Sequence, residues 1–327
     1  MMNLPLRLKR LRQSPTVRAM MQETHLHTQQ LIAPLFVSEV HSVTQEIKSM
    51  PGVYQLPLTA LPVEIDVLSS LNIPAVILFG LPAQKDATGS ASSAKEGIIQ
   101  QAIRRIKTLN PTLIVIADVC LCEYTSHGHC GILAGEHIDT DQTLIQLAAI
   151  AVSYAQAGAD WVAPSSMTDG MVTAIRTALD FAGYTHVAIL SYAVKYNSIF
   201  YGPFREAALG APQFGNRKSY QMDPANASEA LREAALDVQE GADLLMVKPA
   251  MNYLDIIYRI KTHFPEVPLC AYQVSGEYAM IKAASALACI DETDAMIESL
   301  LAIKRAGADL IITYFAKKMA QHLANKS

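Results

Sequence analysis

The feature of this sequence that most limits its fold is the alternation of short apolar runs with longer stretches of helical periodicity. Eight runs rich in Val, Ile, Leu and Ala recur from residue 31 onward, at 31–37, 74–80, 112–119, 159–164, 186–193, 242–249, 267–274 and 308–315. Runs that are apolar on both faces are typical of parallel strands covered by helices. Three of the intervening segments end in Ala-Gly or Glu-Gly just before the next run, which predicts a left-handed glycine cap at each helix end.

Eight strand–helix units predict a (β/α)₈ TIM barrel, a fold that typically needs about 250 residues. An open, doubly wound sheet is the alternative, but no G-x-G-x-x-G or Walker motif follows any of the runs. The choice matters for function, because barrel enzymes place their active sites at the carboxyl ends of the strands and in the loops that follow. We therefore expect residues 31–327 to form one catalytic barrel domain.

Residues 1–30 differ from the rest of the chain and are interpreted as an N-terminal arm. Basic residues stand there among Leu and Met, and prolines interrupt any long helix: Arg7, Lys9, Arg10, Arg12 and Arg18, with Pro5 and Pro15. Such an arm could pack on a neighbouring subunit. A frayed terminus explains the same residues equally well.

The composition excludes several classes of protein. Hydrophobic residues make up 51% and charged residues 17%, which supplies a large core and argues against extensive disorder. The net charge of −4 argues against nucleic acid or an anionic membrane as a partner. No apolar run reaches the roughly 18 residues of a membrane span, and no apolar segment of a secretory signal follows the basic start. The five cysteines do not resemble a disulfide framework, so we expect a reducing, cytoplasmic compartment.

Two lysines, Lys195 and Lys248, follow consecutive predicted strands. Either lysine alone could be structural and extend its ammonium group outward to solvent. Because neighbouring strands lie about 4.8 Å apart, however, the two side chains can converge at one end of the barrel. Mutual repulsion and apolar surroundings would then lower both pKa values and make free amine available at neutral pH. The sequence thus favours attack on a ketone or aldehyde and Schiff-base chemistry.

A cysteine-rich loop follows the third predicted strand. Cys120, Cys122 and Cys130 form a C-x-C-x₇-C pattern that also contains His127 and His129. Three thiolates suit zinc and leave a fourth position for water or substrate, as in catalytic sites. Two alternatives stay open: three reduced cysteines without metal, or a structural site in which His129 is the fourth ligand.

A long Gly- and Pro-rich segment at 201–230 follows the fifth strand, and we interpret the region around 197–222 as an active-site lid. It carries aromatic and basic residues: Tyr201, Phe204, Arg205, Arg217, Lys218 and Tyr220. Because arginine binds carboxylates bidentately, the lid fits an anionic substrate. A surface excursion without function is the alternative.

Together these motifs resemble the porphobilinogen synthase (5-aminolevulinate dehydratase) family. The resemblance spans nearly the whole chain, and its most specific segments are 78–82, 117–131, 195–207, 216–257, 271–284 and 305–317. It implies a hydro-lyase of tetrapyrrole and heme biosynthesis that condenses two 5-aminolevulinate molecules to porphobilinogen with loss of two waters.

The resemblance also implies a role for each lysine. Lys248 would hold the molecule that becomes the propionate side of the product, and Lys195 would hold the second molecule. The carboxylate anchors would be Ser275 and Tyr314 for the first molecule, and Arg205, Arg217 and Gln221 for the second. Asp118 and Ser165 are implied as further catalytic residues, and Tyr201, Phe204 and Tyr272 as further substrate-binding residues.

Metals and assembly are implied in the same way. Zinc on Cys120, Cys122 and Cys130 would lie close to the amino group of the second substrate molecule. An allosteric magnesium ion would bind through Glu233. The basic arm is similar to the family arm that wraps a neighbouring subunit, and the usual assembly is a homo-octamer.

The chain departs from the family pattern at a few positions. Ser166 and Met171 stand where the family usually has an acid and a base, and their loss could disturb a surface pair or an intersubunit contact. Residues 85–97 are shortened. Ser219 replaces the cysteine of a second zinc site, so we expect one zinc ion per chain.

Two rival functions are weighed against this one. The first is a class I aldolase-type barrel with a single Schiff-base lysine and a structural cysteine loop; the second lysine and the arginines of the lid argue against it. The other is a non-catalytic zinc-binding paralogue, which the intact set of chemically active residues argues against.

Overall fold

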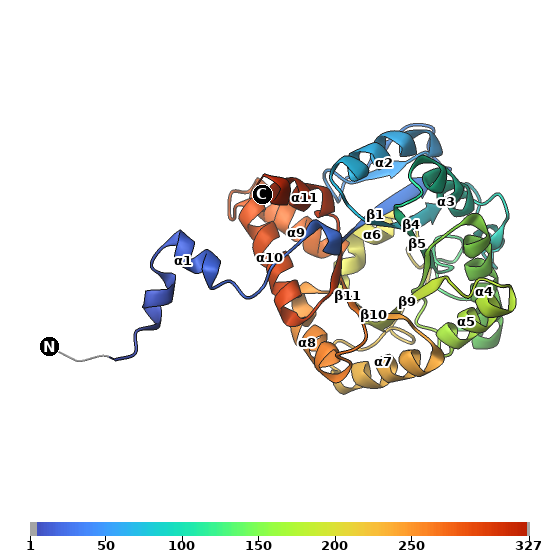
Figure 1. Cartoon of the computed structure of the whole chain (residues 1–327). Helices are drawn as coiled ribbons and strands as arrows, with labels where there is room; N and C mark the ends of the chain where they lie inside the picture. Colours follow the sequence, from blue (N-terminus) through green and yellow to red (C-terminus); the bar gives the residue numbers. More distant parts are fainter. Residues whose placement is uncertain (1–4, 326–327) are drawn as a thin grey trace.

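A closed barrel of parallel strands forms the centre of the computed structural model, which describes residues 5–325. The strands pair in the order β1 (Leu31–Ser38), β4 (Ala75–Leu81), β5 (Ile114–Val119), β8 (Trp161–Pro164), β9 (Ala188–Lys195), β10 (Leu244–Lys248), β11 (Leu269–Gln273) and β12 (Leu310–Thr313). Pairing of β12 with β1 closes the ring, which Figure 1 shows from one end. The predicted (β/α)₈ barrel is confirmed, and the open sheet is excluded.

Helices surround the barrel and connect its strands (Figure 1). After successive strands come α2 (Leu61–Ser70), α3 (Ile98–Leu109), α4 (Thr140–Ala157), α5 (Met171–Phe181), α7 (Ser228–Glu240), α8 (Leu254–His263), α10 (Glu292–Ala306) and α11 (Ala316–Ala324). The predicted glycine caps are present: Gly158, Gly241 and Gly307 end α4, α7 and α10 with φ of 103°, 103° and 123°. Such angles favour glycine because it has no Cβ.

Additional short elements lie in the loops. Helices α6 (Gly202–Ala207) and α9 (Ser275–Ala286) follow β9 and β11, at the carboxyl ends of the strands. Single 3₁₀ turns occur at η2 (Thr28–Gln30), η3 (Leu58–Ala60), η4 (Ser90–Ser93), η5 (Ile199–Tyr201) and η6 (Met251–Tyr253). Two short antiparallel hairpins, β2 (Gln45–Glu46) with β3 (Tyr54–Leu56) and β6 (Leu133–Ala134) with β7 (His137–Ile138), were not predicted, because two or three residues carry no readable alternation.

The pairing of β9 with β10 contains an irregularity that matters for the site. Leu245 pairs with Ser191 and Val247 with Val194, so β9 holds one residue more than β10 between these two pairs. A β-bulge of this kind reverses the inward–outward alternation of side chains. Ser191 accordingly faces outward and bonds Asp237 of α7, whereas Lys195, four residues later, faces into the barrel cavity.

The first part of the chain, through α1 (Pro15–Met20), lies apart from the barrel, whereas Leu26 and η2 pack on it. This first part contains η1 (Leu8–Arg12) and α1, neither of which has a buried residue. Leu6, Leu8 and Met20 are 84%, 76% and 73% exposed, and Figure 1 shows this segment extending away from the ring of helices. Residues 1–4 of the expected arm lie outside the described residues.

Within residues 5–325, no helix has the length and apolar character needed to cross a membrane.

Candidate active site

A small cavity lies at the carboxyl ends of the barrel strands and has a volume of about 20 Å³. It is lined by Phe79, Asp118, Cys122, Glu123, Ser165, Lys195, Tyr201, Phe204, Arg205, Arg217 and Lys248. These residues come from five barrel strands or the loops that directly follow them, and from the segment after β9. The fold therefore brings most of the predicted site residues to one point.

The two lysines lie side by side at the centre of this cavity. Lys195 ends β9, Lys248 ends β10, and the two residues are direct partners in the strand pairing. Both are 5% exposed. The Nζ atom of Lys195 donates a hydrogen bond to the backbone oxygen of Ser165.

Aromatic rings enclose Lys248. Its Nζ atom lies 4.3–5.3 Å from four ring centroids, those of Tyr272, Tyr192, Phe204 and Tyr201. The Tyr192 ring also lies 5.5 Å from Nζ of Lys195, so both lysines contact the same aromatic ring. This surrounding keeps bulk water from the amines.

Burial, followed by the charge of Lys195, lowers the pKa of Lys248 from 10.5 to about 7. Asp118 acts in the opposite direction but does not compensate for these effects. A lysine with this pKa is about half neutral at pH 7, and the neutral amine is the nucleophile. The predicted lowering is thus confirmed at Lys248.

Asp118 lines the same cavity as the lysines. Its Oδ2 atom accepts a hydrogen bond of 2.9 Å from the Ser165 hydroxyl. Burial, with a further contribution from the charge of Glu123, raises the pKa of Asp118 to about 7, although the two lysines lower it. A carboxyl group that exchanges its proton near neutral pH is suited to general acid–base work.

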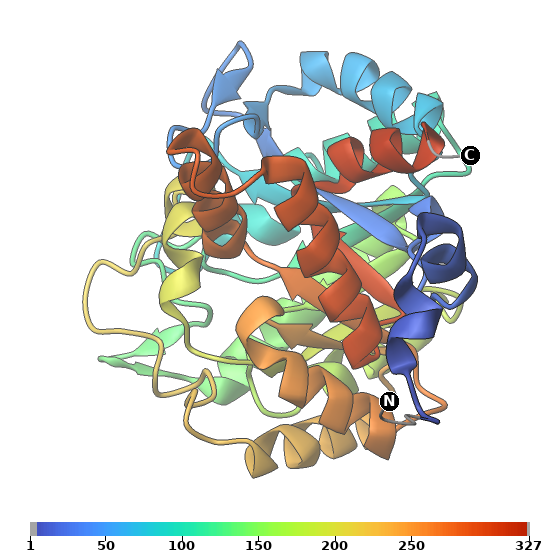
Figure 2. The same ribbon diagram turned by 90° about the vertical axis from the view of Figure 1, so that its left-hand side faces the viewer.

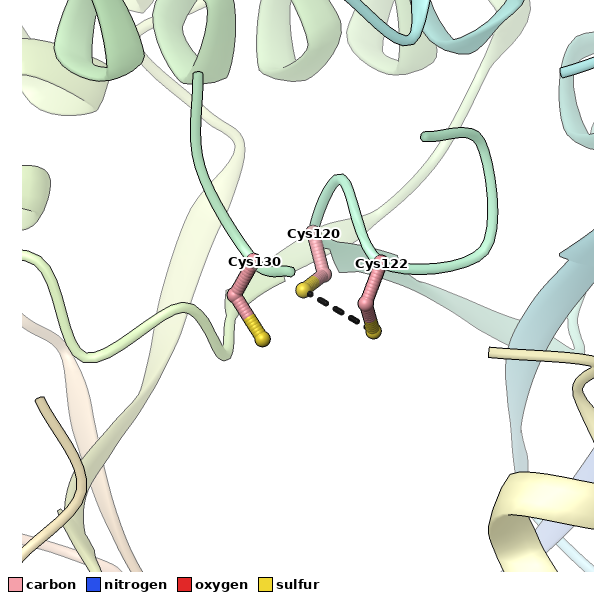
Figure 3. A group of neighbouring side chains, drawn as sticks. All are labelled: Cys120, Cys122 and Cys130. Atoms are coloured by element: carbon pink, nitrogen blue, oxygen red, sulfur yellow. Dashed lines mark hydrogen bonds between the residues drawn. The ribbon is translucent and has the colours of Figure 1, made fainter. Parts of the chain in front are cut away.

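The three predicted metal-binding cysteines converge beside the lysine cavity. Their Sγ atoms all lie within 4.8 Å of one another, and all three side chains are buried. Figure 3 shows the three thiols directed toward a common point, with Sγ of Cys120 3.4 Å from Sγ of Cys122. Tetrahedral zinc–thiolate bonds of about 2.3 Å require sulfur atoms about 3.8 Å apart, so the cluster needs only small adjustments to bind zinc.

The thiols also hydrogen-bond one another, which shifts their pKa values in opposite directions. Hydrogen bonds from Cys120 and Cys122 lower the pKa of Cys130, and the hydrogen bond with Cys120 raises the pKa of Cys122. The Cys122 thiol also lies 3.2 Å from Oε2 of Glu123. Asp118, Cys120 and Glu123 form a second, overlapping group close enough to hold a metal ion.

The predicted carboxylate anchors of the second substrate lie in two places. Arg205 and Arg217 line the cavity, whereas Gln221 lines an adjoining groove of about 700 Å³. Arg217 is fixed by donating to the backbone oxygens of Gly128 and Gly210 at 2.9 and 2.6 Å. Nε of each arginine and both amide atoms of Gln221 are buried and have no hydrogen-bond partner in the described part of the chain.

The predicted anchors of the first substrate, Ser275 and Tyr314, lie outside the cavity lining. The Tyr314 hydroxyl is 3.0 Å from that of Tyr272, whose ring contacts Lys248. Ser275, at the start of α9, accepts a hydrogen bond of 2.9 Å from the backbone N–H of Phe204. These residues are connected to the cavity through Tyr272 and Phe204.

Glu233 lies on α7, away from the lysine cavity. It lines the adjoining groove, which Asp169 and Glu229 also line. Burial, followed by the charge of Asp169, raises the pKa of Glu233. Glu233 is in neither of the two potential metal-binding groups found among residues 5–325.

The two departures from the family pattern after β8 are buried. Ser166 is 1% and Met171 3% exposed, and the Ser166 hydroxyl contacts the Met171 sulfur at 3.6 Å. Neither side chain lies at the surface of this chain. Two neutral side chains in mutual contact occupy these positions.

Three residues of the site were not predicted from the sequence. Phe79 and Glu123 line the cavity, and the Tyr192 ring lies beneath both lysines. Glu123 follows Cys122 directly, a signal that could have been used. Tyr192 could not be found by alternation, because the bulge in β9 turns it to the same side as Lys195.

The lowered pKa of Lys248 predicts how stability depends on pH. The unfolded chain binds the proton more tightly than the folded chain, so the destabilisation is complete below about pH 7 and fades as pH rises toward 10.5. We expect Lys248→Met to raise the free energy of unfolding by on the order of 3 kcal/mol at pH 7 and by much less at pH 10. Urea unfolding at both pH values measures this, with the exposed Lys95→Met as control. An equal effect at both pH values would contradict the prediction.

Comparison with known proteins agrees with the geometry. The model of the delta-aminolevulinic acid dehydratase family matches residues 5–322. A delta-aminolevulinic acid dehydratase of Halalkalibacterium halodurans is 58% identical over 317 residues, covering 97% of this chain and 96% of that protein. One from Staphylococcus aureus is 50% identical over 320 residues, covering 97% and 98%.

A solved structure shows the same fold. The delta-aminolevulinic acid dehydratase (porphobilinogen synthase) of Toxoplasma gondii, in complex with the reaction product porphobilinogen, superposes with a TM-score of 0.96 at 41% identity. The match covers 98% of this chain and 92% of that one. With a family match along nearly its whole length and relatives at 50–58% identity, this chain belongs to the delta-aminolevulinic acid dehydratase (porphobilinogen synthase) family.

Proposed function

We propose that this chain condenses two molecules of 5-aminolevulinate to porphobilinogen, with Lys195 and Lys248 each holding one molecule. The observation that carries this proposal is the direct pairing of the two lysines in one buried cavity. Two ketone substrates need two amine nucleophiles within reach of each other, which a barrel with a single lysine does not provide.

Each lysine acts as a covalent nucleophile. The neutral Nζ atom attacks the ketone of one substrate, and loss of one water leaves an imine. Formation of the pyrrole ring then breaks the C–N bond that joins each substrate carbon to its lysine, and both lysines are released as free amines. The two waters that leave therefore carry the two ketone oxygens, one from each imine-forming step. The pKa of about 7 at Lys248 supports this role, since free amine is abundant at neutral pH.

We assign proton transfer to Asp118 and Ser165. They form a hydrogen-bonded pair of 2.9 Å that lines the lysine cavity. Imine formation requires a proton for the departing water, and ring formation requires removal of protons from carbon and nitrogen. A carboxyl with its pKa raised to about 7 can both donate and accept them.

The carboxylates of the two substrate molecules would bind at two separate sets of residues. Arg205, Arg217 and Gln221 would bind the carboxylate of the molecule on Lys195, which would give their unpaired buried atoms a partner. Ser275 and Tyr314 would bind that of the molecule on Lys248. Tyr201, Phe204 and Tyr272 would form the walls. Entry of two substrates requires the lid to open, because the cavity holds little more than one water.

Cys120, Cys122 and Cys130 would hold a zinc ion. Their convergence and soft donor atoms fit zinc, and three protein ligands leave one position open. When bound, zinc supplies Lewis acidity that makes a substrate amine easier to deprotonate. Ser219 lies outside the cysteine group, which supports one zinc per chain.

Assembly and regulation form a further part of the proposal. The exposed leucines of the segment before β1 would pack on a neighbouring subunit of a homo-octamer. Glu233 would bind an allosteric magnesium ion that keeps most of its waters. The five free cysteines suit a reducing compartment, the cytoplasm.

Replacing either lysine tests the proposal. We expect Lys195→Ala and Lys248→Ala each to lower porphobilinogen formation by about a thousandfold or more, because both covalent bonds are required. Colorimetric detection of porphobilinogen measures this. Exposed Lys95→Ala is the control and should match the unaltered protein. Substantial turnover by either active-site variant would contradict a two-lysine mechanism.

Removing the metal provides a second test. We expect a strong chelator to abolish porphobilinogen formation and added Zn²⁺ to restore it, with about one zinc bound per chain. Cys130→Ser should bind zinc at least about tenfold more weakly, whereas Cys289→Ser, at an exposed cysteine, should bind it normally. Full turnover by protein shown to contain no metal would refute a catalytic zinc.

A further inference from the structure

The loop that carries the cysteines also contacts the lid. The backbone N–H of Gln213 donates to the His127 oxygen at 3.0 Å, and Arg217 donates to the Gly128 oxygen at 2.9 Å. The two backbones approach so closely that a Cβ on Gly128 would lie 2.3 Å from the backbone oxygen of Ala211. Figure 2 shows the lid and the β6–β7 hairpin, which follows the cysteine loop, at the same end of the barrel.

His129 makes the side-chain contacts of this interface. Its Nε2 lies 3.1 Å from the backbone oxygen of Phe214, and its Nδ1 lies 3.2 Å from the Tyr220 hydroxyl. The ring is 5% exposed and also packs against the Phe214 ring, with centroids 4.9 Å apart. Both nitrogens of one imidazole therefore bond the lid, at points on either side of Arg217.

The chemistry of imidazole suits both bonds at once. The Phe214 oxygen can only accept, so Nε2 carries the hydrogen and donates it. In the tautomer that carries its hydrogen on Nε2, Nδ1 accepts from the Tyr220 hydroxyl. The backbone N–H of His129 donates to Nδ1 of His127 at 3.1 Å, a hydrogen bond within the cysteine-rich loop itself.

We propose that His129 is a positioning residue that fastens the closed lid to the metal-binding loop, so that metal binding and lid closure are coupled. This rests on the proposed binding of metal at the cysteines. Cys130 directly follows His129 in the chain. A metal ion bound to the Cys130 sulfur would therefore also restrict the backbone that carries the His129 imidazole. Gly128, one residue earlier, holds Arg217. Metal would thus prepare the carboxylate anchor without touching the carboxylate, and lid closure would in turn raise metal affinity by the same factor.

Amide hydrogen exchange of residues 211–222, measured without substrate, tests the coupling. In the unaltered protein we expect the lid to exchange about tenfold more slowly with bound Zn²⁺ than after chelation. In His129→Phe, which keeps an aromatic ring but loses both side-chain hydrogen bonds to the lid, most of this slowing by zinc should be lost, while the backbone contacts of His127 and Gly128 remain. His137→Phe, which removes an exposed imidazole from the adjoining groove, should behave like the unaltered protein.

Zinc content is measured on every sample. If His129→Phe binds too little zinc, Tyr220→Phe is measured in its place, because it removes the lid hydroxyl that bonds His129 and should also speed lid exchange in the zinc-bound protein. Slow lid exchange in the zinc-bound variant, or a lid that ignores zinc in the unaltered protein, would overturn the coupling. Because no turnover enters the measurement, failure of the coupling is distinguishable from failure to make porphobilinogen.

Discussion

The pairing of Lys195 with Lys248 across β9 and β10 is the constraint on which the rest of the site depends. Two ammonium groups in a dry cavity repel each other and lack hydration, so at least one must give up its proton readily. Lys248, which is enclosed by aromatic rings, is that residue, with a pKa near 7. The free-energy cost of burying these amines is borne by the surrounding barrel, whose strands are buried on both faces.

The neighbouring groups are arranged around this pair. Asp118 supplies a compensating carboxyl that itself titrates near pH 7, and its serine partner holds one of its oxygens. The cysteine cluster shares Cys120 with the group formed by Asp118 and Glu123. Arg205 and Arg217 of the lid line the same cavity as the lysines. This places amines, a proton carrier, a potential Lewis acid and anion anchors within one small volume, as a condensation of two charged substrates requires.

The sequence allowed the barrel, its glycine caps and the convergence of the cysteines to be predicted, because these depend on periodicity and local spacing. The position of Tyr192 was not predictable, since one extra residue in β9 reverses the alternation that locates inward side chains. The contacts of His129 with Phe214 and Tyr220 join loops 85 and 91 residues apart in sequence, for which no local pattern exists. Gln221 was expected beside the arginines, and its backbone N–H donates to the Arg217 oxygen at 2.9 Å, while its side chain lines the adjoining groove.

Trapping the covalent intermediates tests the central claim most directly. Protein mixed with 5-aminolevulinate is reduced with sodium borohydride, digested and examined by mass spectrometry. The account predicts reduced substrate adducts on the peptides containing Lys195 and Lys248, and on no peptide from protein reduced without substrate. If protein that forms porphobilinogen carried an adduct on neither Lys195 nor Lys248, this result would contradict the account.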